Sequence, residues 1–504
     1  TGTLTWNQDA NTSTITGTVA LAVLTKIGAG TLRLASPTLG IGLLTASAGT
    51  VNFNPSGDST FTGTLAGTGT VTKTGPGTLV LTGPNTFGTA GGTFAFGATN
   101  TNHGAIRLTH PQALGAHAKV ALNGQNNGVS RLELAGGHVF PFDVDSSGKT
   151  MDPAYTALRN VSGDNTLQGT VNQSATGGGL AIETLAGSQL AITGNITNSV
   201  NAASPRDLRI TGAGTTIVNG AVRNSTTTTV TLTKLTKEGT GTLVLNGTNT
   251  HGDAATSTDV MAGKLVVNGT ITVSPVTVAA QAVLGGTGTI PSANVQGTIA
   301  IAIGQAPLVI AGPLALAGAT LALDGVGTAP VHVLVTRASL TGSFASVTGL
   351  PVGYRLDTGY NGTAIALVRK PTADYEIWAD AHGLDPAGNG APGLDHEADG
   401  LANGVEFVLG LDPTSGDLTS PNLPVARLSG TDLVVTFTRL KVAATNGFAS
   451  VVEWSASLTG GTWTAASEAQ TRVTDHGDTE TVTTTIPLPP GTPRCFARLR
   501  VAGP

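Results

Sequence analysis

An acidic stretch in the last quarter of the chain has the residue types and the spacing of a cation-binding loop. It reads Asp395-His-Glu-Ala-Asp-Gly-Leu-Ala-Asn-Gly-Val-Glu406, so oxygen-bearing side chains recur at alternate positions. A hard cation such as Ca²⁺ takes about six to eight oxygen ligands at about 2.4 Å, and alternate side chains of a tight loop can converge on one ion. Counting Asp395 as position 1, the predicted calcium ligands are Asp395, Glu397, Asp399, the carbonyl of Leu401, Asn403 and Glu406.

Two positions of this loop support the interpretation. Gly400 at position 6 permits a sharp turn, and Glu406 at position 12 can bind the ion through both carboxylate oxygens. The stretch therefore resembles the loop of EF-hand and dockerin modules, with Glu397 and Ala402 as departures from their pattern. The resemblance implies a structural calcium ion of modest affinity. The alternative is an acidic loop between two helices, with Glu406 on a solvated face.

Three histidines could form a second site, because His103, His110 and His117 are seven residues apart. On one helix they would align, but Gly104 and Pro111 break any such helix, so we expect solvated loop histidines. The chain has no His-Glu-x-x-His, Cys-x-x-Cys or Gly-x-Ser-x-Gly motif. It therefore carries no signature of a zinc protease, a structural zinc site or a serine hydrolase.

The only close acidic pair before residue 370 is Asp143 and Asp145, which would share one face of a strand. Asp152 follows in the same loop-like stretch, Phe140 to Tyr155. Two carboxylates placed across a sugar are the machinery of a glycosidase, so a polysaccharide-degrading enzyme is one hypothesis. The alternative that we favour is a solvated loop or a chance cation site.

A repeated phrase indicates the elements that position these residues. It occurs at Lys26–Leu34, Lys73–Leu81 and Lys237–Leu245, where Gly-x-Gly is followed by Thr-Leu-x-Leu. The glycines permit a tight turn with positive φ, and the alternating residues after them are typical of a short strand. Stacked turns of this kind share one linear core, and asparagines at the turns can form side-chain ladders. We therefore predict a β-solenoid; a row of β-sandwiches is the alternative, disfavoured by only 4% aromatic residues.

The phrases at Lys73–Phe87, Gly263–Ile271, Ala282–Ile290 and Leu316–Leu323 resemble the autotransporter-associated β-strand repeat. The resemblance covers residues 1–370. It implies a right-handed parallel β-helix passenger that is secreted and displayed outside the cell. The sequence departs from a full autotransporter because it lacks the series of amphipathic strands of a membrane barrel, so we expect the translocator to be absent from this chain.

The composition of the 504-residue chain favours an all-β protein. It has 70 glycines, 39% hydrophobic and only 11% charged residues, which excludes both a charged disordered chain and a coiled coil. The net charge of −5 gives no reason to expect a nucleic-acid partner. The long uncharged run at 285–323 is broken by prolines and glycines, so we expect strands and no direct membrane span.

The composition changes after residue 370, and we predict four parts. Residues 1–370 form the solenoid, 371–412 an acidic helix-loop-helix with the calcium site, 413–424 a linker, and 425–504 a small antiparallel β-sandwich. The tail resembles C-terminal modules of large secreted proteins of Verrucomicrobia-like bacteria. The single cysteine, Cys495, excludes an internal disulfide framework and is expected to be a small apolar core residue.

These observations predict a non-enzymatic, extracellular structural protein. The chain starts at Thr1 without a leader segment, so we expect either that a signal segment has been removed or that the N-terminus was trimmed. Thr1–Trp6 begins directly as a strand, which would leave a bare β edge for head-to-tail association into a homo-oligomer or filament. An adhesin that binds surface glycans or cells is the alternative, and a polysaccharide-degrading β-helix enzyme is a second alternative.

Overall fold

The computed structural model of the chain describes residues 2–96, 103–123, 130–147, 156–174, 179–227, 230–370, 373–416, 418–459, 461–491 and 494–503. It contains two compact units, Thr1–Arg369 and Lys370–Pro504. The chain is 49% strand and 6% helix, and it forms a parallel β-solenoid of about 14 turns with a small antiparallel part at the C-terminus. The predicted fold class is therefore confirmed.

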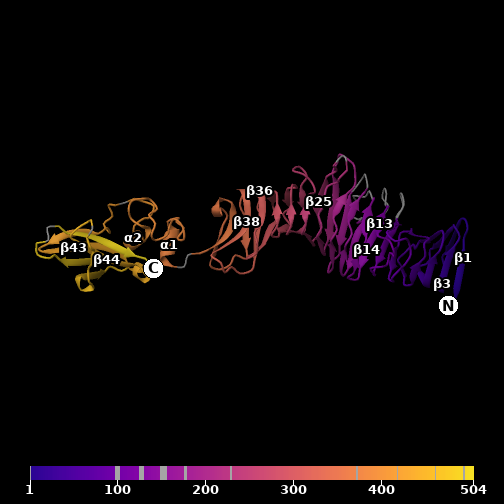
Figure 1. Cartoon of the computed structure of the whole chain (residues 1–504), viewed down its shortest axis with the longest axis horizontal. Helices are drawn as coiled ribbons and strands as arrows, with labels where there is room; N and C mark the ends of the chain where they lie inside the picture. The colour runs from indigo at the N-terminus through magenta and orange to yellow at the C-terminus, as the bar shows by residue number, and fades with distance from the viewer. Residues whose placement is uncertain are drawn as a thin grey trace. The chain divides into compact units, whose positions relative to one another are not determined.

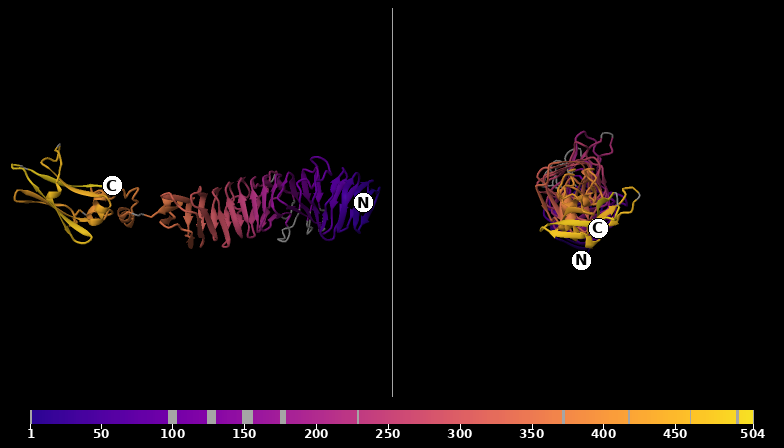
Figure 2. Two further views of the ribbon diagram at one scale, coloured as in Figure 1. Left: turned by 90° about the horizontal axis from the view of Figure 1, so that it is seen from below. Right: turned by 90° about the vertical axis from the view of Figure 1, so that its left-hand side faces the viewer.

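Strands of successive turns stack side by side in parallel register in the first unit (Figures 1 and 2). The largest described sheet contains β1 (Thr3–Asn7), β3 (Val19–Ile27), β5 (Thr38–Ala46), β7 (Ser59–Phe61), β8 (Thr64–Ala66), β10 (Thr78–Leu81), β12 (Gly104–Leu108), β14 (Ser130–Ala135), β17 (Leu158–Ser162), β20 (Leu180–Thr184), β23 (Arg206–Gly212), β25 (Thr233–Lys237), β27 (Thr248–Asn249), β28 (Thr258–Val260), β30 (Thr270–Ile271), β31 (Val276–Val278), β33 (Thr289–Ile290), β34 (Ala293–Val295), β36 (Leu308–Leu316), β38 (Val331–Thr341), β40 (Tyr354–Asp357) and β41 (Ala364–Arg369).

Three further sheets form the other sides of the turns. One contains β2 (Thr12–Ile15), β4 (Thr31–Leu34), β6 (Thr50–Phe53) and β9 (Thr70–Lys73). The next contains β11 (Thr93–Phe96), β13 (Lys119–Leu122), β16 (Asp143–Ser146), β19 (Val171–Gln173) and β22 (Ile196–Asn198). The last contains β15 (Val139–Phe140), β18 (Asp164–Leu167), β21 (Gln189–Ile192), β24 (Thr215–Val218), β26 (Thr242–Leu245), β29 (Gly263–Val267), β32 (Ala282–Gly285), β35 (Thr298–Ala302), β37 (Thr320–Asp324) and β39 (Ser346–Thr348).

The core of this unit is a set of columns of aliphatic side chains. Alternate residues of each strand point inward, as in Thr242-Leu-Val-Leu245, where both leucines are buried. The parallel register then places like residues above one another from turn to turn. One column, buried throughout, consists of Leu243, Leu265, Leu284, Ile299 and Leu321.

A column of glycines lets the turns approach closely at one corner. A Cβ added to Gly247 would lie 2.2 Å from the carbonyl oxygen of Gly220, and one added to Gly269 would lie 2.2 Å from that of Gly247. These glycines have ordinary φ angles, so close approach and not a left-handed conformation requires them. The predicted amide ladder is present beside them: Asn246 Nδ2 donates to Asn219 Oδ1 (2.8 Å), and Asn268 Nδ2 donates to Asn246 Oδ1 (3.1 Å).

The lysine that opens each repeated phrase is buried. Lys26, Lys73 and Lys237 are at most 1% exposed, and each Nζ donates to three backbone carbonyls of the turns. For Lys237 these are the carbonyls of Glu238 (2.6 Å), Gly239 (2.9 Å) and Ala262 (3.1 Å). Burial lowers the pKa of both Lys73 and Lys237 to about 8. Each lysine thus joins its own turn to the following one from inside.

The last turns of the first unit are covered by antiparallel strands. β38 pairs in parallel with β36 and antiparallel with β41, and β41 also pairs antiparallel with β40. A single 3₁₀ turn, η1 (Tyr360–Gly362), precedes β41. At this end of the largest described sheet, an antiparallel pair of strands therefore replaces the parallel stacking, and β40 is the last strand.

The second unit joins two small antiparallel sheets through one apolar core. One sheet contains β42 (Val425–Ser429), β43 (Asp432–Leu440), β47 (Thr479–Pro487) and β46 (Thr471–Asp475), and the other contains β45 (Thr464–Ala465), β44 (Ala449–Ser455) and β48 (Phe496–Ala502). The helices are α1 (Asp374–Ala381), α2 (Asn403–Leu409), α3 (Lys441–Thr445) and the 3₁₀ turn η2 (Glu468–Gln470). Leu409 of α2 packs with Val435, Val452 and Val482 of the sheets. Cys495 is partly buried at the edge of this core, and burial raises the pKa of its thiol.

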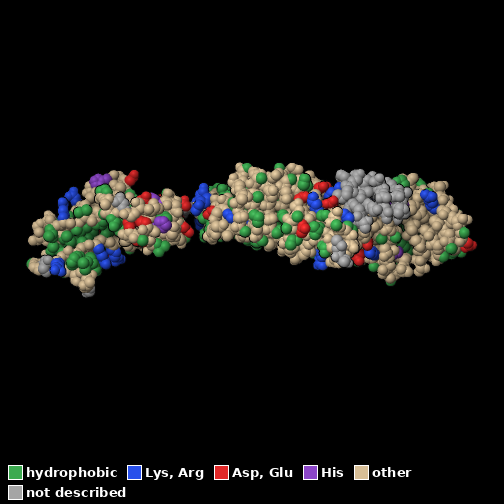
Figure 3. All heavy atoms as spheres, turned by 90° about the horizontal axis from the view of Figure 1, so that it is seen from above, with side chains coloured by type: hydrophobic (Ala, Val, Ile, Leu, Met, Phe, Trp, Pro, Cys, Tyr) green, Lys and Arg blue, Asp and Glu red, His purple; other side chains and the backbone are tan. Residues whose placement is uncertain are grey.

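The visible surface of the first unit is mainly uncharged (Figure 3). Charged side chains of this unit form a ladder on β12, β14, β17 and β20. The register aligns Arg107, Glu133, Arg159 and Glu183, and the buried Glu133 carboxylate lies 2.8 Å from Arg107 Nη2. Among the described residues, no helix is long and apolar enough to cross a membrane.

Candidate metal centre

The acidic loop of the second unit folds back on itself directly before α2. Ala398 and Gly400 both have positive φ, 61° and 98°. The Asp395 carboxylate accepts the backbone N–H groups of Asp399 (3.2 Å) and Gly400 (2.9 Å), and Asp399 Oδ1 accepts that of Leu401 (2.8 Å). The alternate acidic residues are thereby turned toward a common side, as their spacing predicts.

The structure brings three of the predicted side-chain ligands together. One carboxylate oxygen from each of Asp395, Glu397 and Asp399 lies within 4.8 Å of the other two. Separations of this size allow a single small cation to contact all three oxygens. No Lys or Arg lies between residues 371 and 410 to balance these charges from within the same stretch.

Glu406 on α2 lies beside this group, next to Glu397, and is only 1% exposed. Its Oε2 atom and both carboxylate oxygens of Glu397 are buried without a hydrogen-bond partner among the described residues. The Glu397 carboxyl group is a neighbour of the Glu406 carboxyl group, and two carboxylates can share a hydrogen bond only through a proton. Burial raises the pKa of Glu406 to about 8, and the neighbouring carboxyl groups of Glu397, Asp399 and Asp395 contribute to this rise. The site thus needs either a proton or a cation to relieve the repulsion.

Asn403 has a structural role in addition to its predicted role as a ligand. It is fully buried at the first position of α2, and its Nδ2 donates to the carbonyls of Asn389 and Ala391, both at 3.1 Å. Its backbone N–H donates to the Leu394 carbonyl (2.7 Å). The side chain therefore ties the preceding segment to the helix, while its Oδ1 has no hydrogen-bond partner among the described residues. This oxygen remains available for the predicted ligand role.

The flanking elements differ from those of an EF-hand. α1 ends at Ala381, and the irregular stretch 382–402 separates it from α2. Asp385 lies in this stretch, where its Oδ1 accepts the backbone N–H of Ala387 (3.0 Å), so it stabilises a local turn. The loop is thus followed by a helix at its C-terminal end but is not preceded by one directly.

An aromatic cluster supports the helix that carries Glu406. Tyr375 of α1 packs edge-on against Phe407, with ring centroids 5.2 Å apart, and its hydroxyl donates to the Gly390 carbonyl (2.8 Å). Burial and the nearby Glu406 carboxylate raise the pKa of Tyr375 to about 12. Tyr375 was not among the predicted site residues, although its place on a short amphipathic helix was a usable signal.

The oxygen donors fit a hard cation. Three carboxyl groups converge, Glu406 lies beside them, and no nitrogen or sulfur ligand takes part in the described cluster. Such a set suits Ca²⁺ better than zinc, which prefers imidazole and thiolate. The Leu401 carbonyl remains a predicted ligand.

The histidines do not form a metal site in the described structure. His117 Nδ1 lies 2.8 Å from the Leu114 carbonyl, and its ring packs 5.0 Å from that of Phe87. His110 accepts the backbone N–H of Gln112 through Nδ1 (3.1 Å). His103 is buried, so the expectation that all three are solvated is wrong for this residue.

The aspartates of the glycosidase hypothesis are engaged between turns. Asp143 Oδ1 accepts the backbone N–H of Thr170 (2.7 Å). Asp145 pairs with Lys119 (3.1 Å) of the preceding turn and accepts the Ser174 hydroxyl of the following turn. Asp152 lies outside the described residues. These bonds give both carboxylates a role in holding turns together.

Comparison of the chain with known protein families, with curated proteins and with solved structures finds no match. The function must therefore be argued from the residues and the geometry of the two units.

Proposed function

We propose that this chain is a non-enzymatic, extracellular structural protein, similar in design to an autotransporter passenger. The observation that carries the proposal is the stacking of about 14 turns through parallel strands. Each inner turn is hydrogen-bonded on both sides, so the solenoid resists bending and stretching along its axis. At a strand spacing of about 4.8 Å, about 14 turns give a rod of roughly 65–70 Å.

Side-chain ladders support a load-bearing role. The amides of Asn219, Asn246 and Asn268 join three turns, and the Arg107–Glu133 pair joins two more. The buried ammonium of Lys237 connects its own turn to the carbonyl of Ala262 in the next turn. These bonds resist relative sliding of turns, a motion that backbone pairing alone would oppose weakly at the corners.

In this proposal Asp395, Glu397, Asp399 and Glu406 hold a calcium ion that stabilises the second unit. The ion would replace the proton that the crowded carboxyl groups otherwise need. Its effect would reach the core, because Glu406 lies on the same helix as Leu409, which packs against the sheets. Binding would therefore be linked to folding of this unit, with a stabilisation of about 2.7 kcal/mol at a free calcium concentration of 100 Kd.

Calorimetric titration with Ca²⁺ tests the site, with Glu406→Gln as the variant and the exposed Glu468→Gln as the control. Glutamine keeps the shape of Glu406 but removes its charge, so we expect binding to be lost and the unliganded fold to persist. Glu468→Gln should bind as the unaltered chain does. Equal binding by both variants, or no heat with the unaltered chain, would refute the calcium assignment.

Head-to-tail association is the second element of the proposal. Four of the five residues of β1 are exposed, and β1 pairs only with β3 among the described strands. An exposed strand can accept a strand from a second copy. Negative-stain images should show end-to-end filaments in the presence of Ca²⁺ and shorter particles in chelator. Single particles at every protein concentration would refute self-association, and shortening of a polysaccharide by the pure protein would refute the non-enzymatic role.

A further inference from the structure

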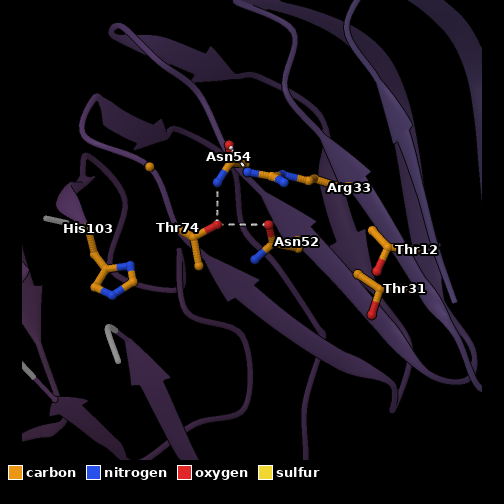
Figure 4. Close-up of a pocket in the computed structure, with 8 residues that line it drawn as sticks. Thr12, Thr31, Arg33, Asn52, Asn54, Thr74 and His103 are labelled. Carbon is orange, nitrogen blue, oxygen red and sulfur yellow. Dashed lines mark hydrogen bonds between the residues drawn. The ribbon is translucent and has the colours of Figure 1, made fainter. Parts of the chain in front are cut away.

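A polar hollow lies on the outer face of the sheet formed by β2, β4, β6 and β9. The register aligns Thr12 with Thr31 and places Arg33 beside Asn52. Because the alternate residues of these strands point into the core, the outward positions can be polar without weakening the fold. The hollow has a volume of about 450 Å³ (Figure 4).

The side chains that line the hollow are polar, and only Gly75 has none. The lining residues are Thr12, Thr31, Arg33, Asn52, Asn54, Thr74, Gly75 and His103. The lining contains one guanidinium and no carboxylate. A site of this composition offers hydrogen bonds in several directions and one positive charge, but no apolar wall for a hydrophobic ligand.

Hydrogen bonds hold the lining in place before any ligand arrives. Arg33 Nη2 donates to Asn54 Oδ1 (2.7 Å), and Asn54 Nδ2 donates to Thr74 Oγ1 (2.5 Å). The Thr74 hydroxyl in turn donates to Asn52 Oδ1 (2.9 Å). This chain of bonds connects residues of three successive turns (Figure 4). A preorganised set of donors loses less side-chain entropy when it binds a ligand.

Arg33 keeps most of its donors for a ligand. A guanidinium has about five N–H groups. The Arg33 side chain is exposed, and one of its N–H groups donates to Asn54. The others can pair with a carboxylate in a bidentate manner, which is the strongest interaction this side chain makes. One arginine is too little for a nucleic-acid backbone, which requires several cations along its phosphates. The favoured ligand therefore has many hydroxyl groups and isolated negative charges.

We propose that this hollow binds an acidic oligosaccharide, with Arg33 pairing with a sugar carboxylate and Asn52, Thr31 and Thr12 bonding to hydroxyls. The proposal is independent of the structural role above, because a rod may carry a binding site on one side without any change in its core. It gives the solenoid a specific recognition surface on the turns that contain β2, β4, β6 and β9.

The test is calorimetric titration of the full chain with a galacturonic acid hexamer and with its fully methyl-esterified form. The two ligands share their backbone and most hydroxyls, but only the first has free carboxylates. We expect saturable binding of the acid form and at least about tenfold weaker binding of the ester, because a charge-assisted bidentate pair is lost.

Two arginine variants locate the binding. Arg33→Gln should weaken binding of the acid form by at least about tenfold, whereas Arg355→Gln, which removes another exposed guanidinium of the same unit, should leave it unchanged. Unaltered circular dichroism and thermal unfolding would show that both variants keep the fold. Equal binding of acid and ester, an equal effect of the two substitutions, or no binding of either ligand would overturn the proposal.

Discussion

Replacing Gly247 by alanine should destabilise the solenoid through one misplaced methyl group. The new Cβ would lie 2.2 Å from the Gly220 carbonyl oxygen and 2.8 Å from its carbon. Real Cβ atoms keep at least about 3.0–3.4 Å from such atoms, so one turn would have to move by about 1 Å. The φ angle of Gly247 is ordinary, so the alanine backbone itself would not be strained.

The cost follows from the position of Gly247 within the column. If residue 247 moves away from Gly220, it moves toward Gly269 of the next turn. That approach is also close, because a Cβ added to Gly269 would lie 2.2 Å from the Gly247 carbonyl oxygen. Overpacking of this kind costs about 1–3 kcal/mol. The shift would also strain the bond between Asn246 and Asn219, which is worth about 0.5–1.5 kcal/mol. We therefore expect a total loss of about 2–4 kcal/mol.

Urea unfolding of Gly247→Ala beside Gly17→Ala measures this effect. No heavy atom lies within 4 Å of a Cβ added to Gly17, and its φ is also ordinary. Both substitutions reduce the entropy of the unfolded chain alike, by about 0.4–1 kcal/mol, so the difference between them reports the clash. Hydrogen exchange should show faster opening around β24, β26 and β29 in Gly247→Ala alone. Equal midpoints for the two variants would refute the requirement for close approach.

Two further predictions concern buried ionisable groups. Lys237→Met should lower stability by about 2–4 kcal/mol because three partly buried carbonyls lose their donor. Thermal unfolding measures this loss, and an equal loss in the partly exposed control Lys264→Met would contradict the prediction. Burial lowers the pKa of His251 from 6.5 to about 4, so between these values the unfolded chain binds a proton that the folded chain does not. Stability should therefore fall by about 3 kcal/mol as the pH drops from 6.5 to 4, a dependence that urea titrations at several pH values should find reduced in His251→Gln.

The solenoid could be predicted from the sequence because its turns use a local signal. Gly-x-Gly followed by Thr-Leu-Val-Leu specifies a turn and an alternating strand without knowledge of distant residues. The register between turns has no such signal. The column of Leu243, Leu265, Leu284, Ile299 and Leu321 has separations of 22, 19, 15 and 22 residues, so no fixed period reveals it.

The burial of the lysines and the close approach at the glycine column could not be predicted from the sequence, for related physical reasons. Lysine is rarely buried, and only the carbonyls of a neighbouring turn make burial of Lys237 acceptable. Glycine was expected to provide positive φ, as it does at Gly239 (67°), but Gly247 is needed because another backbone lies close to it. Both reasons depend on contacts between turns.

The candidate metal centre was partly predictable. Alternation along the loop predicts that Asp395, Glu397 and Asp399 lie on one side of a tight turn, and one carboxylate oxygen of each lies within 4.8 Å of the other two. The burial of Glu406 and the bonds of Asn403 Nδ2 to the preceding segment depend on how α2 packs, and spacing alone carries no information about either.

The amide ladder also affects how the chain ages chemically. An asparagine followed by glycine is prone to deamidation, because the backbone nitrogen of the unhindered glycine can attack the side-chain carbonyl and release ammonia. Asn219, Asn246 and Asn268 are each followed by glycine. In the folded chain the side-chain amide of Asn246 is hydrogen-bonded to both Asn219 and Asn268. The backbone N–H of Gly269 donates to the Leu245 carbonyl (3.0 Å), which holds the attacking nitrogen of the Asn268–Gly269 pair in place. The contacts that align the turns thus also slow a covalent reaction, and a turn that opens would lose both its register and its chemical protection.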